Sequence, residues 1–434
     1  MSLFGIWERF GLQENPYSQA TLEADEVGNR LLVGRDREVG VLQSAIGSGG
    51  SHPTVEGPIG AGKSSLIAVA AYRMTQACIS KARRELYLPV PKFFQIQADL
   101  DDFESHVYFS LAQTLIRNVR VFSAVGLDEP NVGAIGRWLN SPDYTHGGAS
   151  VTVFGTGASA DRGTEPNETQ GFLRSGLPEL VRQELDRCVP KGAGGIICVV
   201  DNLELLQSTG KARDTLDELR DRLFNIPQLR WVLCGSRGIV SRARSERLSG
   251  VFQAPLVVEP LADSAAIEAI ERRIAEYALG TAEAPVTPLT FEYLYNALRR
   301  NLRDALSTAQ EFALWLYTET IQQELAIPTE ADRKALLEGW LAKRAAAARR
   351  DATGVQPRQW EFFVDLCQAG GRIGSSVFGD YGFANQQQFT SAVTALVQAN
   401  LMVRETDPDD GTKTINAVTA LGWLVFFFRD DSKH

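Results

Sequence analysis

Apolar and polar positions follow two different periods along this chain. Between residues 54 and 258, short apolar runs are separated by stretches in which apolar positions recur every three or four residues. The run Gly195–Val200 is continuously apolar, which is typical of a strand buried on both faces of a parallel sheet. Strands that alternate with helices predict an α/β fold, with helices covering both faces of a parallel sheet.

The same periods predict the other elements of this part. Strands are expected at Thr54–Glu56, Lys92–Ala98, Arg230–Cys234 and Ala254–Val258, and helices at Val39–Ile46, Ser64–Ala82, His106–Val121, Pro178–Cys188 and Ala212–Phe224. Residues 126–170 interrupt the alternation, because they are rich in small and polar residues and lose the helical period. Ser150–Phe154 alternates like a strand within them. We predict an inserted hairpin or a mobile loop here, which a protein partner could order.

From Asp263 onward the pattern is helical as far as residue 348, and residues 351–357 are typical of a linker. The helix expected at Gln386–Ala399 is followed by two strands around an Asp-Gly turn, a pattern that predicts a β-hairpin. Helices followed by such a hairpin indicate a winged-helix domain. We therefore predict an N-terminal segment on the adenine side (1–50), a sheet-containing core (51–262), a helical lid (263–350) and a winged-helix domain (358–434).

Composition narrows the class of protein. Of 434 residues, 44% are hydrophobic and 22% charged, as in ordinary globular proteins. No apolar run approaches the ~20 residues of a membrane span, and the five cysteines have no metal-ligand spacing. We expect a cytoplasmic protein with reduced thiols and no membrane partner. The net charge of −9 argues against a protein that coats nucleic acid by bulk charge, although it leaves room for a local basic patch.

A glycine-rich loop between a short strand and a long helix carries the clearest chemistry. The sequence GPIGAGKS at Gly57–Ser64 fits the phosphate-binding pattern GxxxxGK[ST] at every fixed position. Glycines let backbone N–H groups surround a phosphate at a helix N-terminus, Lys63 reaches the β- and γ-phosphates, and Ser64 offers its hydroxyl to Mg²⁺. We expect ATP and Mg²⁺ as ligands, bound through Gly57, Pro58, Gly60, Ala61, Gly62, Lys63, Ser64 and Ser65.

A second magnesium contact is expected at the end of a neighbouring strand. Asp201 directly follows Gly195–Val200 and suits that role. The next residue, Asn202, has an amide that cannot accept a proton, so we expect slow hydrolysis. Glu204 either replaces the missing base or is a solvated carboxylate at a helix start.

Arginines follow the strand at Arg230–Cys234. Arg237, or Ser236 beside it, is placed to sense the γ-phosphate, with a surface charge as the alternative. The segment Arg242–Arg247 is dense in arginine, and Arg244 is our candidate for an arginine finger on the nucleotide of a neighbouring subunit. The alternative is that the arginines of this segment are solvated charges on a helix surface.

These motifs together resemble the AAA+ and STAND branches of the P-loop ATPases, and within them AAA+ proteins of the replication-initiator (origin-recognition) type. Leu32–Glu38 resembles the family segment that packs beside adenine, and Arg300–Leu306 resembles the initiator sensor 2 motif at the head of a lid helix. The resemblance implies that Arg303 reaches the γ-phosphate from the lid. It also implies an adenine-side contact through Val33, Gly34 and Arg35.

Two departures from the initiator pattern keep a second hypothesis open. Asp201–Glu204 and Cys234–Arg237 are more similar to STAND signalling ATPases, although the lid motif and terminal repeats of STAND proteins are absent. The first hypothesis is an ATP-binding, slowly hydrolysing switch that forms homo-oligomers with ATP and assembles on DNA through the winged helix. The alternative is a STAND-like signalling ATPase in bacterial stress or phage defence, which binds a protein partner through the winged helix or the insertion and acts through a separate effector.

The distribution of charged residues indicates which part of the chain could contact DNA. A basic stretch favours DNA contact, and it comprises Arg333, Lys334, Lys343, Arg344, Arg349, Arg350, Arg358 and, further on, Arg372. From Arg358 onward, however, six basic residues face nine acidic ones, and the expected hairpin turn carries Asp407, Asp409 and Asp410. These aspartates would repel phosphate, so we expect DNA contact from the basic stretch and not from the wing.

Overall fold

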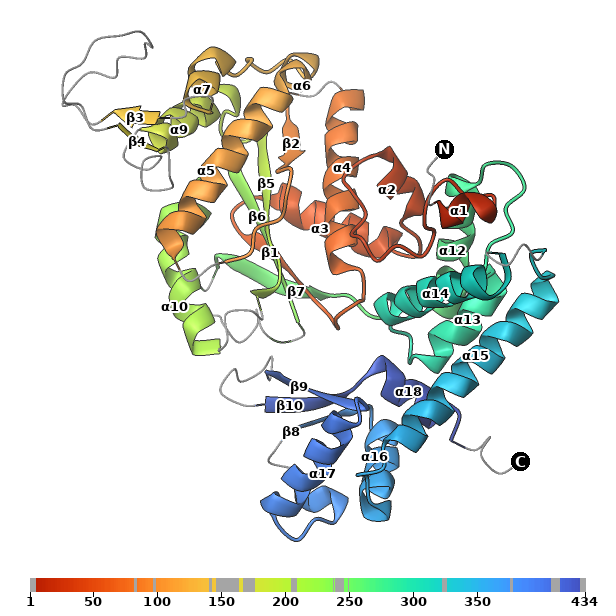
Figure 1. Cartoon of the computed structure of the whole chain (residues 1–434). Coiled ribbons are helices and arrows are strands. Elements are labelled where there is room, and N and C mark those ends of the chain that lie inside the picture. The colour runs from red at the N-terminus through yellow and green to blue at the C-terminus, as the bar shows by residue number, and fades with distance from the viewer. Residues whose placement is uncertain are drawn as a thin grey trace.

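The structure is a computed structural model, and its helices and strands carry the labels of Figure 1. It describes residues 5–81, 84–96, 99–139, 143–145, 164–166, 176–203, 209–236, 238, 246–248, 250–321, 326–374, 378–406 and 414–429.

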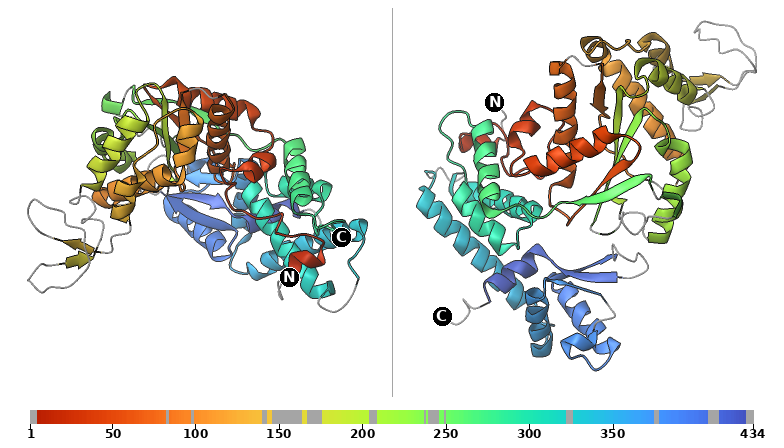
Figure 2. Two further views of the ribbon diagram at one scale, coloured as in Figure 1. Left: turned by 90° about the horizontal axis from the view of Figure 1, so that it is seen from above. Right: turned by 180° about the vertical axis from the view of Figure 1, so that it is seen from behind.

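A five-stranded parallel sheet forms the centre of the first half of the chain, as the sequence predicts. Its strands lie in the order β2 (Leu86–Pro89), β5 (Gly194–Val200), β6 (Leu229–Gly235), β1 (His52–Glu56) and β7 (Phe252–Val257). Helices cover both faces (Figures 1 and 2). One face carries α3 (Asp36–Ser48) and α4 (Lys63–Lys81); the other carries α5 (Leu100–Arg117), α9 (Leu177–Cys188), α10 (Thr209–Leu219) and the π-helical turn η2 (Arg220–Phe224).

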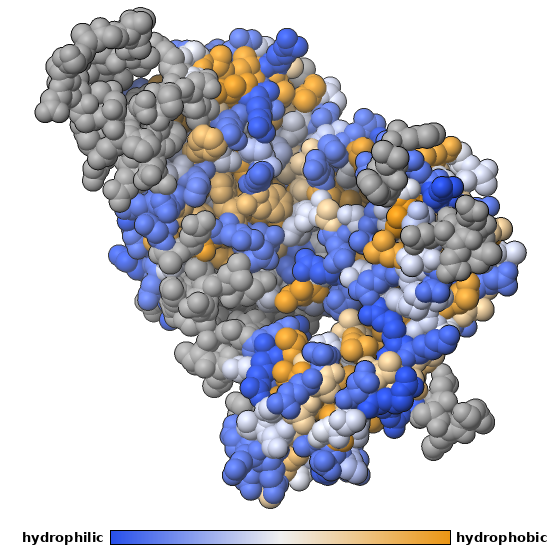
Figure 3. Space-filling model, in the orientation of Figure 1, coloured by the Kyte–Doolittle hydropathy of each residue, from blue (hydrophilic) through white to orange (hydrophobic). Residues whose placement is uncertain are grey.

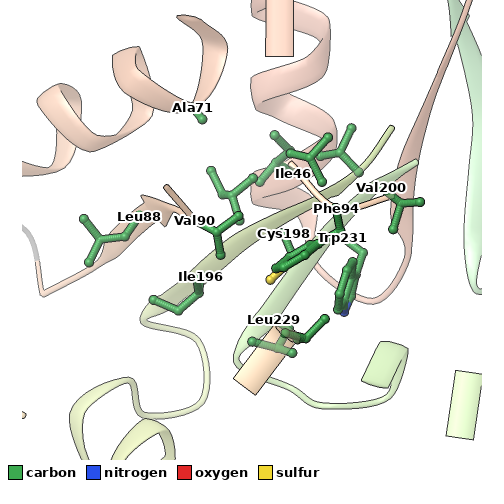
Figure 4. Close-up of a cluster of buried hydrophobic side chains, with 14 of the residues drawn as sticks. Ile46, Ala71, Leu88, Val90, Phe94, Ile196, Cys198, Val200, Leu229 and Trp231 are labelled. Atoms are coloured by element: carbon green, nitrogen blue, oxygen red, sulfur yellow. The ribbon is translucent and has the colours of Figure 1, made fainter. Parts of the chain in front are cut away.

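Trp231 of β6 anchors the core beneath one face of the sheet. Its ring is fully buried and packs on Phe94, with ring centroids 5.9 Å apart (Figure 4). It also packs on Phe224, with ring centroids 5.3 Å apart. The indole Nε1 donates a hydrogen bond to the carbonyl of Leu223 at 3.2 Å, so its polar group is satisfied. All five cysteines are buried.

The second strand of the sheet lies earlier than we predicted. Lys92–Ala98 alternates like a strand, but within its described part, residues 92–96, Phe94 forms an isolated bridge with Val200. Leu86–Pro89 pairs with β5 instead. Gly194 explains the pairing: a Cβ there would lie 2.1 Å from the backbone oxygen of Leu86, so only glycine lets the strands approach.

The inserted region contains a helix that the sequence analysis missed. After α6 (Val119–Ala124), helix α7 spans Val132–Leu139 and packs on α5 and α9, with Ile135 fully buried. Tertiary packing on these two helices overrides its glycine-rich composition. A hairpin is present as expected, formed by the antiparallel strands β3 (Asp143–Thr145) and β4 (Thr164–Pro166). The strand expected at Ser150–Phe154 lies outside the described residues.

A helical lid follows the sheet. It comprises α12 (Asp263–Tyr277), α13 (Pro288–Ala297), α14 (Leu302–Leu316), η4 (Tyr317–Ile321) and α15 (Glu330–Asp351), and a short η3 (Glu246–Leu248) precedes β7. The N-terminal segment, with α1 (Ile6–Arg9) and α2 (Glu26–Leu31), packs on this lid. The hydroxyl of the buried Tyr17 donates a hydrogen bond to the carbonyl of Val286 at 2.6 Å, which fixes that attachment.

The C-terminal part is a winged-helix domain, as predicted. Its elements are α16 (Pro357–Gln368), β8 (Arg372–Gly374), η5 (Phe378–Tyr381), α17 (Gln386–Gln398), β9 (Met402–Thr406), β10 (Thr414–Val418) and α18 (Ala420–Phe427). The three strands form an antiparallel sheet in the order β8-β10-β9. Helix α18 packs on α15, so the lid and this domain share one hydrophobic cluster.

The described part of the chain has no helix that is both long and apolar enough to cross a membrane. On the face drawn in Figure 3, polar groups predominate and apolar groups are scattered among them.

His52, at the start of β1, makes the stability of this fold depend on pH. Its ring is buried, its Nδ1 accepts a hydrogen bond from the Trp231 backbone N–H at 3.2 Å, and its Nε2 lies 2.9 Å from the carbonyl of Phe224. These partners fit a neutral ring with its hydrogen on Nε2, since a second hydrogen on Nδ1 would face the Trp231 N–H. Burial lowers the pKa of His52 below its ordinary value.

We expect folding stability to be complete above the unfolded His pKa of ~6.5 and to fall as the pH drops below it. The unfolded chain then takes up a proton that folded His52 does not, at a cost of up to ~1.4 kcal/mol per pH unit. Thermal melting between pH 7.5 and 5 should show a shallower pH dependence in His52→Gln, which does not titrate. Equal pH dependence in both proteins would exclude this role.

Candidate nucleotide-binding site

The predicted phosphate loop connects β1 to α4. Gly60 and Gly62 both have φ of 83°, a left-handed conformation that glycine adopts without strain. Lys63 begins α4, and its buried Nζ donates hydrogen bonds to the carbonyls of Gly57 and Pro58 at 3.0 and 3.1 Å. The ammonium group therefore lies over the loop at a helix N-terminus, where a phosphate would be bound.

Ser64 and Asp201 meet although 137 positions separate them in the sequence. The Ser64 hydroxyl donates a hydrogen bond of 2.7 Å to Oδ2 of Asp201, which directly follows β5. A hydroxyl and a carboxylate oxygen are the hard ligands that Mg²⁺ prefers, and the pair suits a nucleotide-bound ion. No group of three or more His, Cys, Asp and Glu side chains is arranged to hold a metal anywhere among the described residues.

Asn202 lies beside this pair in a strained backbone conformation. Its φ is 57°, in the left-handed region that asparagine tolerates better than most residues. Its N–H donates to Oδ1 of Asp201 at 2.9 Å, so the turn helps to hold the carboxylate. Backbone geometry thus gives a reason for asparagine at this position. Three other candidates, Glu204, Arg237 and Arg244, lie outside the described residues.

A pocket brings eight of the predicted residues together. The loop, Asp201, the lid and the N-terminal segment bound this pocket. The N-terminal segment is attached to α4 by a hydrogen bond of 3.1 Å from the Leu22 N–H to the Ser65 hydroxyl oxygen. Its predicted lining residues are Gly60, Gly62, Lys63, Ser64, Ser65, Asp201, Asn202 and Arg303. No sequence motif identifies the other lining residues, which are Gln19, Ala20, Thr21, Ile59, Arg273, Leu302 and Leu306.

The adenine-side segment does not line this pocket. Val33 packs in the lid cluster, and a Cβ on Gly34 would lie 2.7 Å from Ala265 of α12. Arg35 is buried, and its Nη2 donates hydrogen bonds to the carbonyls of Ala61 at 3.0 Å and Glu259 at 2.6 Å. These three residues therefore support the loop and the lid from outside the pocket.

Arg303 and the loop meet at the first turn of α14. A Cβ added to Gly60 would lie 2.5 Å from Oδ1 of Asn301 and 3.1 Å from Cβ of Arg303. The phosphate loop is therefore in close contact with the lid. The Arg303 side chain is exposed and borders the pocket.

A second cavity, of about 840 Å³, adjoins the outer side of the loop. Pro58 and Ala61 border it together with the α13–α14 turn and the three strands of the winged-helix domain. Ile59 and Val403 are 40% and 39% exposed, so apolar groups face this space from both sides. Figure 3 shows the surface hollowed between the winged-helix domain and the rest of the molecule.

No family model matches the chain, and no curated protein matches it. Solved structures are similar over nearly its whole length. The Aeropyrum pernix ORC1 protein in complex with DNA has 13% identity and a TM-score of 0.42, covering 98% of this chain and 96% of that one. The A. pernix ORC2 protein (ADPNP-ADP complexes) has 11% identity, a TM-score of 0.47 and coverage of 97% and 98%.

Pyrobaculum aerophilum Cdc6p has 11% identity and a TM-score of 0.38, covering 96% of this chain and 98% of that one. ORC and Cdc6 proteins are the replication-initiator group that the sequence motifs resemble. What this chain binds is inferred below from its own residues.

Proposed function

We propose that the chain is an ATP-binding, slowly hydrolysing switch whose nucleotide state controls how its winged-helix domain engages DNA. One observation carries this proposal: a single turn, Arg299–Asn301 between α13 and α14, contacts the phosphate loop at one end and the winged-helix domain at the other. A change at the loop therefore has a short route to the DNA-binding part.

Several contacts hold the turn in place. Arg299 and Arg300 have φ of 56° and 62°, consecutive left-handed conformations that are costly for residues other than glycine. Backbone hydrogen bonds from Arg299 to Asn296 and from Arg300 to Tyr295, at 3.1 and 2.9 Å, hold them. Arg300 also pairs with Asp263 of α12 at 2.6 Å, which ties the turn to the first lid helix.

The winged-helix end of the turn is an aromatic contact. The Arg299 guanidinium lies 5.1 Å from the ring centre of Trp423 in α18. Gly371 makes room for that ring, since a Cβ there would lie 2.3 Å from it. Asn301, at the other end, touches Gly60.

The residues of the pocket account for binding better than for hydrolysis. Lys63 supplies positive charge to the terminal phosphates, and Ser64 with Asp201 would hold the Mg²⁺ that neutralises them. Asn202 cannot accept a proton from water, so we infer turnover well below the ~10 per second of typical enzymes. Homo-oligomers that form with ATP would complete the site from a neighbouring subunit, and the Arg242–Arg247 segment is our candidate for that contribution.

The coupling is tested by Arg299→Ala. We expect this variant to bind ATP normally but to lose about two- to fivefold of the ATP-to-ADP difference in DNA affinity, because an exposed cation–π contact is worth ~0.5–1 kcal/mol. DNA titrations with ATP and with ADP measure that ratio. Arg182→Ala is the matched control, since the Arg182 guanidinium lies 5.3 Å from the ring centre of Tyr108 and lines neither the nucleotide pocket nor the second cavity. An unchanged ratio in Arg299→Ala would remove the turn from the coupling.

The basic stretch is only partly available to DNA. Arg333 is not available for the DNA contact that we expected from this stretch, because its side chain is 7% exposed and donates a hydrogen bond to the Pro328 carbonyl at 2.7 Å. Arg344 pairs with Glu311, and Arg349 lies over Trp360. Lys343 and Arg350 remain exposed, seven residues apart on one face of α15.

We expect reversal of Lys343 and Arg350 to glutamate to weaken DNA binding by about tenfold or more. The slope of log affinity against log salt should also fall by about two, since each phosphate contact contributes ~0.9. Binding at several salt concentrations checks both effects, and exchange of both residues for glutamine should give a smaller loss. Unchanged affinity would place the DNA contact elsewhere.

The STAND-like alternative is favoured by the charge of α17. None of its thirteen residues is charged, and its exposed side chains include Gln387, Thr390, Ser391 and Gln398. Such a face suits a protein partner as well as DNA. Wild-type protein that binds ATP but no DNA at low salt would favour this second function.

A further inference from the structure

Arg273 of α12 is a lid arginine that no motif identifies. It lines the nucleotide pocket together with residues 19–21 of the N-terminal segment. Its only hydrogen bonds with described residues run from Nη1 to the backbone carbonyls of Pro16 at 3.3 Å and Ser18 at 2.7 Å. No carboxylate lies within ion-pair distance of it in the described part of the chain.

A buried guanidinium without a carboxylate is costly unless an anion joins it. Arg273 is partly buried, and desolvation lowers the pKa of its guanidinium. Some other arginines of the lid and the N-terminal segment have carboxylate partners; Arg30, for example, contacts Glu276 at 2.6 Å, and Arg300 contacts Asp263 at 2.6 Å. Arg273 thus brings a positive charge that has no carboxylate partner among the described residues to a pocket that already contains a phosphate loop.

The two lid arginines approach the pocket from different sides. Arg303 lies against Gly60 of the loop, whereas Arg273 lies against the N-terminal segment, which is bonded to Ser65 on the first turn of α4. In a phosphate loop the lysine and glycines surround the terminal phosphates, so a nucleotide bound here would place a phosphate nearer the base on the side of Ser65 and Arg273. This separation gives the arginines different tasks.

We propose that Arg273 binds the phosphate of the nucleotide that lies nearest the base, and so makes the lid close on ADP and ATP alike, whereas Arg303 responds to the terminal phosphate. This inference rests on the proposed nucleotide binding. It predicts that the lid recognises a nucleotide in two steps, one common to both states and one specific to ATP. A guanidinium suits the first step because it donates bidentate hydrogen bonds to phosphate.

The test is binding of ATP, ADP and adenosine to the full chain by calorimetry. Arg273→Ala should lose about 10- to 100-fold in affinity for ADP and for ATP by the same factor, with adenosine unchanged. Arg303→Ala should weaken ATP more than ADP. Arg272→Ala is the matched control, because the Arg272 side chain is exposed and already pairs with Glu268 at 2.6 Å. This variant should bind all three ligands like wild type.

Arg273 also holds residues 16–18, so a second variant separates the two roles. Arg273→Lys keeps the charge and a donor for Ser18, and its loss of ADP affinity should be smaller than that of Arg273→Ala. Unchanged ADP affinity in Arg273→Ala, or an equal loss for adenosine, would overturn the inference while leaving the proposed function intact. Wild-type protein that binds neither ADP nor ATP would instead overturn the proposed function, and this inference with it.

Discussion

Lys63→Ala should lose at least about 100-fold in ATP affinity while the protein remains folded. The ammonium is buried over the loop and bonded to the carbonyls of Gly57 and Pro58. A bound phosphate would exchange these for charge-assisted bonds worth ~1.5–3 kcal/mol each, and two such contacts amount to more than a hundredfold. Calorimetric titration with ATP measures the loss.

The matched control is Lys81→Ala, at the exposed end of the same helix. It should bind ATP like wild type. If Lys63→Ala keeps wild-type ATP affinity, the loop is not the nucleotide site and the proposed function fails.

Gly60→Ala should separate the lid from the loop, and Gly62→Ala should not. Both glycines have φ of 83°, so an alanine strains the backbone equally at each. At Gly60 the new Cβ would meet Asn301 at 2.5 Å, whereas at Gly62 it meets nothing within 4 Å. We expect both variants to lose about 100-fold in ATP affinity, because the strained loop no longer presents its N–H groups to a phosphate.

Hydrogen exchange without nucleotide distinguishes the two glycines. Asn301 caps α14 by accepting a hydrogen bond from Asp304 N–H at 3.2 Å. Displacement of Asn301 in Gly60→Ala should therefore speed exchange at the start of α14 by about tenfold, since a lost cap costs ~1 kcal/mol or more. Equal exchange in the two variants would mean that the lid does not depend on this contact.

The sequence predicts the elements that follow from the periodicity of apolar residues and the site that follows from the fixed spacing of a motif. The parallel sheet, the helical lid and the winged-helix hairpin follow from apolar periods, and the loop with Lys63 and Ser64 follows from its motif. The meeting of Ser64 with Asp201 follows from a general rule, because the ends of parallel strands share one edge of a sheet.

Other features depend on contacts between distant segments, which no local pattern records. Gly194 lets β5 approach Leu86–Pro89 closely, so this segment forms the second strand. Packing on α5 and α9 stabilises α7 in a glycine-rich segment. Hydrogen bonds to the carbonyls of Ala61 and Glu259 hold the Arg35 side chain outside the pocket. Arg273 enters it only because the N-terminal segment folds back on the lid, and an isolated arginine in an amphipathic helix gives no signal of that.

The most direct test of the switch is the DNA affinity of the wild-type chain in three states, measured at one salt concentration. The states are no nucleotide, ADP, and a slowly hydrolysed ATP analogue, with binding of each nucleotide verified on the same sample. We predict that the analogue changes DNA affinity at least about fivefold relative to ADP, the lower end of ordinary coupling between sites, and that Lys63→Ala shows no difference. Full binding of both nucleotides with the same DNA affinity in all three states would contradict the account.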